Sequence, residues 1–265
     1  MRTRFTAIIA VLMSFVPLQG QQSHAQLSVT ELLSKLHSAT WQERSEAYEQ
    51  LSSSPSTLSS PKVRASLLDL LDRENKALDA ETRRSASGKA TDRDAEEGNA
   101  EYLAKLQETV DSFADWNDQR QACILVGSSY NPESEFGAKI AAHAKVTVPC
   151  LLQMSNSDIG ADRAQAIPVL VQALAKAKAD LDTRYLEAAK AQISNGLHDQ
   201  DAVVRGETVI ALGAFGSPDM IPALENVARS DPGSDTRSDN GAEWFPIREE
   251  AKKAIALIKQ RQEQK

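Results

Sequence analysis

The chain has 265 residues and carries 30 Lys and Arg against 37 Asp and Glu, a formal net charge of −7 at pH 7. This acidic balance argues against nucleic acid and anionic lipid surfaces as partners, since both select clustered positive charge. Two cysteines are too few for a small disulfide-built domain, and the length suits one or two compact domains or a single elongated one.

Residues 1–25 have the pattern of a secretory signal peptide. Arg2 and Arg4 precede an apolar run, Phe5 to Val16, and the polar stretch after it ends at Ala25. The apolar run is shorter than the roughly 20 residues that a membrane-crossing helix needs. We expect cleavage after Ala25 and export to the periplasm or the extracellular space, without membrane insertion. A cytoplasmic protein with an apolar N-terminus is the alternative. Removing the two arginines leaves 28 basic residues against 37 acidic ones, a formal charge of −9.

The rest of the chain is predicted to be all-α. Aromatic residues are few, and no stretch alternates apolar and polar residues over the length of a strand. Helix start signals recur at short intervals: the capping boxes Ser28 to Glu31 and Thr40 to Glu43, and the cap-proline pairs Asn131-Pro132 and Ser217-Pro218.

The composition divides the mature chain into four parts. Residues 26–78 hold N-terminal helices and a first repeat. Residues 79–101 contain nothing more apolar than alanine and cannot bury enough surface to order themselves. We expect a flexible polar insertion there, with a solvated helix extension as the alternative, at a domain boundary or in a loop between repeats. Residues 102–260 form the main repeat array, and residues 261–265 a polar tail.

A repeated pattern is clearest around Arg205, which Thr208 and Leu212 follow at three and seven residues, on one helix face. Related spacing recurs at four other places: Arg44-Ala47-Leu51, Arg120-Cys123-Gly127, Arg163-Ala166-Leu170 and Arg248-Ala251-Ile255. The arginines at 120, 163, 205 and 248 lie 43, 42 and 43 residues apart. A period of about 40 to 47 residues, with two helices per unit, is typical of HEAT-type solenoids.

The stretch DQDAVVRGETVIALGAFGSPDMIPALENVARSDP, residues 199–232, resembles the HEAT repeat, especially the short bacterial variety also found in phycobilisome lyases. The resemblance rests on Asp201, Val204-Arg205, Thr208, Leu212-Gly213, Gly216 and Ile221-Pro222-Ala223-Leu224. Residues 41–51 and 244–258 are less specific copies. The copy at Arg163 is ambiguous, because Ile167-Pro168-Val169-Leu170 looks like the start of a second helix.

This resemblance implies a right-handed α-solenoid of about four to five HEAT-like helix pairs, whose stacking buries a continuous core. In the family the repeated arginine and a nearby acid are commonly structural. We therefore assign a structural role to Arg44, Arg120, Arg205 and Arg248, with ligand binding as the alternative.

Two further residue sets attract attention. Trp41, Trp116 and Trp244 each lie three or four residues before a repeat arginine. They either pack between repeats or line a partner surface, where tryptophan often anchors binding. Cys123 and Cys150 form a disulfide in an oxidising compartment or, alternatively, two buried thiols.

Known catalytic and metal-binding patterns are missing from the sequence. His37, His143 and His198 are too scattered for a zinc site, and no nucleophile elbow, Walker loop or dinucleotide-binding motif occurs. Residues 198–201, HDQD, fit helix-end capping, and residues 230–243 fit an acidic loop better than an EF-hand. We assign no catalytic, cofactor or metal residues.

Together these features predict an exported, non-catalytic scaffold that presents its solenoid surface to a protein partner of unknown identity. The alternatives are a ligand or glycan binder that uses the tryptophans and, further behind, an enzyme of the phycobilisome-lyase kind. The export signal weighs against the enzyme, because that chemistry belongs with cytoplasmic pigment assembly.

Overall fold

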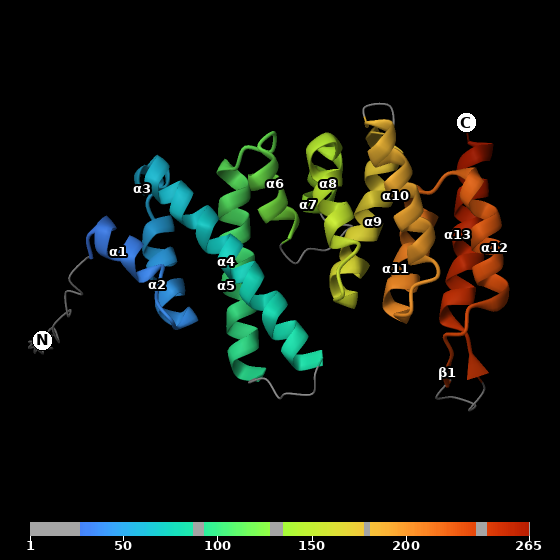
Figure 1. The fold of residues 1–265 in the computed structure, drawn as a ribbon, viewed down its shortest axis with the longest axis horizontal. Coiled ribbons are helices and arrows are strands. Elements are labelled where there is room, and N and C mark those ends of the chain that lie inside the picture. The colour runs from blue at the N-terminus through green and yellow to red at the C-terminus, as the bar shows by residue number, and fades with distance from the viewer. Residues whose placement is uncertain (1–26, 87–92, 128–134, 178–180, 237–242, 265) are drawn as a thin grey trace, which may run out of the picture.

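The computed structural model describes residues 27–86, 93–127, 135–177, 181–236 and 243–264. The predicted signal peptide, residues 1–25, and the Asn131-Pro132 pair lie outside the described residues. Figure 1 shows helices standing side by side along one long axis, from α1 (Val29–Lys35) at one end to α13 (Pro246–Glu263) at the other. The predicted all-α repeat architecture is confirmed, and its handedness stays a prediction.

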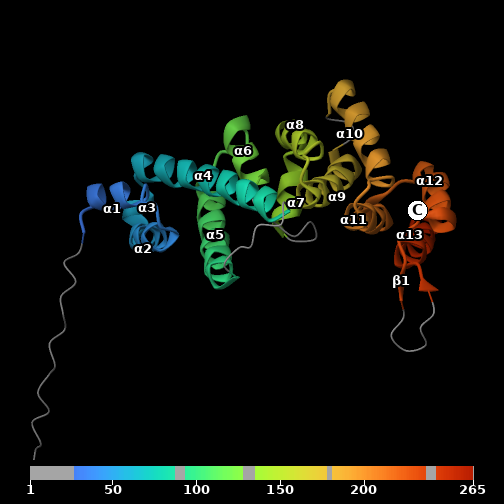
Figure 2. The same cartoon turned by 60° about the horizontal axis from the view of Figure 1, so that its bottom comes forward.

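The N-terminal part of the row is built around one long helix. The helices after α1 are α2 (Trp41–Ser52), α3 (Pro55–Leu58), α4 (Pro61–Ala86), α5 (Arg93–Phe113) and α6 (Gln119–Val126). Figures 1 and 2 both show α4 running obliquely along the row, from α3 past α5 and towards α7 (Glu135–Ala142). This helix therefore links the first repeat to the middle of the array.

The C-terminal part has the more regular stacking. Its remaining elements are α8 (Ala144–Met154), α9 (Gly160–Ala177), α10 (Thr183–Gly196), α11 (Ala202–Phe215), the 3-10 turn η2 (Pro218–Met220) and α12 (Ile221–Ser230). α11 packs between α9 and α13, while α10 packs on α9 and α12 on α13. Two layers of helices result, as a HEAT solenoid requires.

One continuous apolar cluster runs through the row, from Leu32 in α1 to Ile258 in α13. In α4 the cluster includes Val63, Leu67, Leu70 and Leu71, whose spacing places them on one face of the helix. Because no single helix pair can enclose its own apolar face, each pair depends on its neighbours. The cluster crosses from the N-terminal helices to the repeat array without interruption. Among the described residues, no helix is long and apolar enough to span a bilayer.

Short polar side chains start several helices. Ser28 accepts from the Glu31 amide at 3.3 Å while Glu31 accepts from the Ser28 amide at 2.8 Å, which is the predicted capping box. Asp118, Asp182 and Asp201 cap α6, α10 and α11 in the simpler way. The second predicted box is wrong, because Thr40 makes no side-chain cap and Glu43 instead accepts from the Ser38 hydroxyl.

The structure decides three other expectations. Where the polar stretch 79–101 is described it forms the helix extension that was the alternative to a flexible insertion, because α4 extends to Ala86 and α5 begins at Arg93. The acidic segment after α12 contains two short antiparallel strands, β1 (Asp235–Thr236) and β2 (Glu243–Trp244). Pro168 does not start a helix but lies inside α9. The buried residues around it, Ala166 to Ala173, stabilise the helix beyond what the missing proline N–H costs.

Candidate functional site

Arg163 and Arg205 occupy equivalent places in successive repeats. Near the start of α9, Arg163 donates Nε and Nη2 to the Asp199 carboxylate at 2.8 Å each, and Nη1 to the Ser157 carbonyl at 2.9 Å. Near the start of α11, Arg205 donates Nε to the Asp231 carboxylate at 2.7 Å and Nη1 to the Asp199 carbonyl at 2.9 Å. Each arginine thus joins the end of the preceding repeat to the acid that follows its own second helix.

Arg44 of α2 makes similar contacts at the other end of the row, but its acid, Glu74, lies within a helix. Its Nη2 lies 3.0 Å from the Glu74 carboxylate of α4, and its Nη1 donates to the Ser38 carbonyl at 3.0 Å. The phenol of Tyr102 also donates to Glu74, so the buried carboxylate has two donors. Three arginines therefore share one structural geometry, although Arg163 was not in the predicted set.

The other two predicted repeat arginines depart from this geometry. Arg120 contacts Asp69 of α4 at 2.7 Å, and both side chains are more than half exposed. Arg248 of α13 donates Nε to the Asp231 carbonyl at 2.7 Å, and its guanidinium lies 3.7 Å from the ring centroid of Phe245. Equal spacing in the sequence therefore does not ensure an equal contact.

The structure does not support a partner surface at Trp116. The indole is only 6 % exposed, and its Nε1 donates to Asp111 at 3.0 Å. The ring packs edge-on against Phe136 and stacks on His143, with centroids 5.7 and 5.4 Å away. Trp116 thus joins α5 to α7 and to the start of α8 in the core, and it offers no platform for a glycan.

Trp41 also packs inward. Its ring is half-buried and stacks on Tyr102 with centroids 6.5 Å apart. Its Nε1 is buried without a hydrogen-bond partner among the described residues. The side chain of Trp244 lies outside what the structure describes.

A disulfide joins Cys123 of α6 to Cys150 of α8, with Cα atoms 5.3 Å apart. It closes a loop over a sequence separation of 27 residues. In the chain-entropy model, a loop of this length contributes about 3–4 kcal/mol to the free energy of unfolding. The bond fixes two helices that form one wall of the cleft described below.

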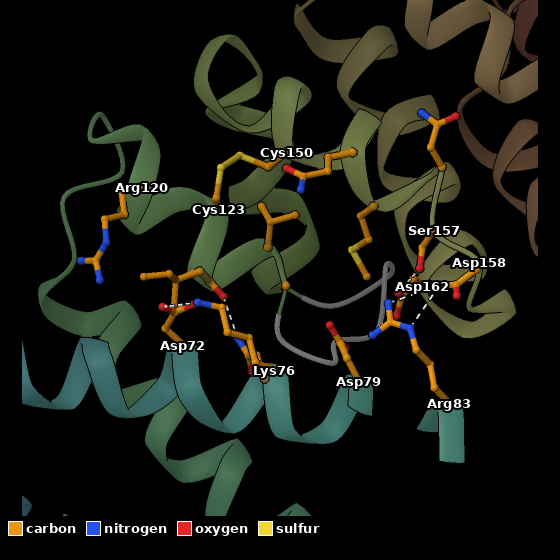
Figure 3. Close-up of a pocket in the computed structure, with 17 residues that line it drawn as sticks. Asp72, Lys76, Asp79, Arg83, Arg120, Cys123, Cys150, Ser157, Asp158 and Asp162 are labelled. Atoms are coloured by element: carbon orange, nitrogen blue, oxygen red, sulfur yellow. Dashed lines mark hydrogen bonds and ion pairs between the residues drawn. A yellow bond between two sulfur atoms is a disulfide. The ribbon is translucent and has the colours of Figure 1, made fainter. Parts of the chain in front are cut away.

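The cleft between α4 and α8 has a volume of about 780 Å³ and is the candidate functional site. Figure 3 shows α4 along one side, the disulfide on the opposite wall, and the segment between α8 and α9 at one end. Asn75 of α4 donates to the Ile124 carbonyl of α6 at 2.9 Å, which ties the two sides together. The chain folds this way because the apolar face of α4 is buried in the core, while its polar C-terminal half extends along the cleft.

Charged side chains dominate the cleft. The aspartates are Asp72, Asp79, Asp158 and Asp162, and the cations are Lys76, Arg83 and Arg120. Lys76 pairs with Asp72 at 2.9 Å, and Arg83 reaches Asp158 at 3.2 Å. Asp162 accepts from the Ser157 hydroxyl. Asp79 points into the cleft from α4 (Figure 3) and has no hydrogen bond or ion pair with any described residue.

Two carboxyl groups of the cleft, those of Asp79 and Asp158, have pKa values shifted in opposite directions. Burial raises the pKa of the Asp79 carboxyl, and the neighbouring Asp162 and Asp158 raise it further against the opposing effect of Arg83. The hydrogen bond from Arg83 lowers the pKa of Asp158 instead. Asp79 is therefore the carboxylate of the cleft that would gain most from a cation supplied from outside.

The cleft was not predicted from the sequence. Its acids and cations come from α4, α6, α9 and the segment between α8 and α9, and nothing in their spacing brings these parts together. The one available signal was the disulfide pair, which predicted that residues 123 and 150 are neighbours. In the described part of the chain, no group of three His, Cys, Asp or Glu side chains could hold a metal ion.

Residues 170–240 match the family model for HEAT repeats. The match spans the end of α9, α10, α11 and α12, including the Arg205–Asp231 pair. A search of curated proteins and a search of solved structures each found no significant match. The chain therefore carries HEAT repeats, as the resemblance of residues 199–232 predicts.

Proposed function

We propose that the chain is an exported, non-catalytic HEAT-repeat scaffold that binds a protein partner in the cleft between α4 and α8. Helical repeat arrays offer extended surfaces whose shape follows from their stacking, and partners commonly bind there. The observation that carries the proposal is the cleft itself, which is lined by four aspartates. One of them, the half-buried Asp79, has no hydrogen bond or ion pair among the described residues. Trp116 is buried, so we place the partner in the cleft and not at this tryptophan.

The chemistry of the cleft favours a partner segment with a lysine or arginine side chain. Four aspartates face three cations, and two of those cations already pair with Asp72 and Asp158. A cation entering beside Asp79 and Asp162 would offset their mutual repulsion in a partly desolvated site. Such a charge-assisted contact is stronger than a neutral hydrogen bond.

Export is supported by two independent features. The first 25 residues have the layout of a signal peptide. The Cys123–Cys150 bond is of a kind that persists in oxidising compartments and is rare where glutathione keeps thiols reduced. If the proposal holds, protein purified from cells begins at Gln26 by mass spectrometry, and thiol-reactive reagents label it only after reduction.

The non-catalytic role rests on the composition of the cleft. The described residues that line it include no histidine, and its two cysteine sulfurs are bonded to each other. Ser157, the only hydroxyl among them, donates to Asp162 and supports the start of α9. The usual combination of a nucleophile with an adjacent general base is thus missing from this part of the chain.

The test compares quantitative capture of envelope proteins by the mature chain and by the Asp79→Lys variant. The matched control is Glu108→Lys, which makes the same charge reversal on an exposed residue of α5. We expect at least one protein to co-purify with the wild type and the control, and to be lost from Asp79→Lys. Circular dichroism and thermal unfolding first establish that all three proteins are folded.

Two results would contradict the proposal. If all three proteins capture the same partners equally well, the cleft does not take part in the interaction. Retention of a small molecule or glycan, without any protein lost from Asp79→Lys, would favour a ligand binder instead.

A further inference from the structure

The repeat arginines show what Arg248 lacks. Arg163 and Arg205 each hold a carboxylate that follows the second helix of their own repeat, and each also contacts a carbonyl from the repeat before. Arg248 keeps the contact to the preceding repeat, since it donates Nε to the Asp231 carbonyl. α13 is the last described helix, so no second helix of that repeat brings an acid to Arg248 within the described residues.

The Arg248 guanidinium is held in place but incompletely used. Phe245 supports its face at 3.7 Å, and the bond to Asp231 fixes one edge. Neither Nη atom has a hydrogen-bond partner within the described part of the chain. The planar fork of an arginine matches a carboxylate with two parallel hydrogen bonds, and a guanidinium that is already ordered loses little entropy on binding.

The surface around Arg248 has the charge that an acidic ligand requires. Lys252 and Lys259 follow Arg248 at four and eleven residues, so the three cations lie on one side of α13. Both lysines are exposed, and Lys252 is already paired with Glu249 of the same helix at 2.8 Å. Residues 246–263 contain five Lys and Arg against three Asp and Glu, whereas the whole chain has a formal charge of −7. The last described helix is thus a basic face on an acidic molecule.

We infer that Arg248 anchors a docking site for an acidic segment of a partner protein, which supplies the carboxylate that Asp199 and Asp231 supply to the preceding arginines. Lys259 would extend the contact along α13, and Lys252 would add to it by exchanging its exposed ion pair with Glu249 for the ligand. The inference rests on the proposed role as a protein-binding scaffold, but it concerns a different surface from the cleft. The ligand it identifies is an Asp- or Glu-rich peptide.

The probe is a synthetic peptide rich in Asp and Glu, acetylated and amidated, with an Asn- and Gln-containing version as the uncharged control. Binding to the mature chain is followed by fluorescence anisotropy and by the arginine Nε–Hε resonance of Arg248 in NMR spectra. We expect the acidic peptide to shift that resonance, and Arg248→Ala to weaken its binding about tenfold. Arg248→Lys should fall between the two, because it keeps the charge and loses the fork.

Arg229→Ala is the matched control, since it removes an exposed arginine from the neighbouring helix α12. If Arg229→Ala and Arg248→Ala weaken peptide binding equally, the effect comes from net charge alone, and the inference is overturned. Unchanged peptide binding in Arg248→Ala would also overturn it, provided that thermal unfolding shows the variant folded. If Arg248→Ala fails to fold, two measurements test the inference instead: weaker peptide binding by Arg248→Lys and the shift of the Arg248 resonance in the wild type.

The main alternative occupant is an acid from the same chain. Asp235, Asp239 and Glu243 precede Arg248 in the sequence. If one of them fills the site, the wild type will not bind the peptide, and a triple variant with Asn, Asn and Gln at these positions will. That result overturns the partner site. Asp79→Lys separates the two proposals, because this variant should lose capture at the cleft and still bind the acidic peptide. If capture depends on Asp79 but the wild type and the triple variant both fail to bind the peptide, only the site at Arg248 is contradicted.

Discussion

At the scale of single residues, burial decides how much each arginine–carboxylate pair contributes. The side chains of Arg205 and Asp231 are 8 % and 2 % exposed, whereas those of Arg120 and Asp69 are 59 % and 58 % exposed. An exposed pair gains little, because water screens the charges and two long side chains lose freedom. In the buried pair, removing one partner leaves an uncompensated charge away from water.

Arg205→Ala should therefore lower the free energy of unfolding by about 3–5 kcal/mol. The variant strands the Asp231 carboxylate and removes the donor to the Asp199 and Gln200 carbonyls. Arg120→Ala should cost no more than about 1 kcal/mol. Urea unfolding followed by circular dichroism measures both. A stable Arg205→Ala protein that has lost binding would show that this arginine serves a ligand instead.

Asp79 should make stability depend on pH. Its folded-state pKa is raised, so ionised Asp79 destabilises the fold above that pKa, and this cost disappears below the ordinary value of 3.8. We expect Asp79→Asn to raise Tm at neutral pH and to leave it nearly unchanged at about pH 3. Scanning calorimetry across this range gives the comparison, with Glu108→Gln as an exposed control. A loss of stability at neutral pH would mean that Asp79 has a stabilising partner.

Sequence reasoning found the repeat at this scale but not its contacts. The spacing of about 43 residues located Arg205 and Arg248 correctly at the starts of α11 and α13. It could not identify Asp199, Asp231 or Glu74 as acid partners, because these lie 26 to 36 residues away and on different elements. Nor could it separate Arg120 from the others, because exposure depends on the neighbouring helices.

At the scale of helices, close packing depends on small residues at contact points. A Cβ atom added at Gly196, at the end of α10, would lie 2.6 Å from Thr208 Oγ1 and 2.9 Å from Ile167 Cδ1. Thr208 has little freedom to move, since its hydroxyl donates to the Val204 carbonyl at 2.7 Å. At Gly206 in α11, the nearest atom to an added Cβ is Ile247 Cγ1 at 4.0 Å.

These two glycines should respond in opposite ways to alanine. Gly196→Ala should lower the free energy of unfolding by about 1–3 kcal/mol, because the core where α9, α10 and α11 meet is overpacked. Gly206→Ala should raise it by up to about 1 kcal/mol, because alanine restricts the unfolded chain and finds open space in the helix. Urea unfolding of both variants beside the wild type measures whether each free energy of unfolding rises or falls. Stabilisation by Gly196→Ala would contradict the close approach of these helices.

The errors in helix prediction have physical causes. Residues 79–86 are polar, and composition alone predicts that they stay unfolded. They are helical because they continue α4, whose core residues Leu67, Leu70 and Leu71 are buried, and because Arg83 binds Asp158. Pro168 left the repeat register around Arg163 ambiguous, because local propensity does not include the burial of Ile167, Val169 and Leu170, which keeps this proline inside α9.

At the scale of the whole molecule, the row of helices combines two electrically different regions. The cleft near the middle is rich in carboxylates, and the C-terminal helix is basic. Both are positioned by the same continuous core, so a partner that reaches from α4 to α13 would meet a fixed arrangement of charges. The repeat family and all-α class could be predicted from periodicity. The cleft could not, because it depends on where the long α4 crosses the array.

The most direct measurement is site-specific photo-crosslinking in living cells, with a benzophenone amino acid at Lys76 on the cleft or at Glu108 on α5. The account predicts a discrete protein adduct from position 76, absent from position 108 and lost when Asp79→Lys is added. Adducts of equal yield from both positions, or none from position 76 while the protein is exported and folded, would contradict a partner-binding cleft.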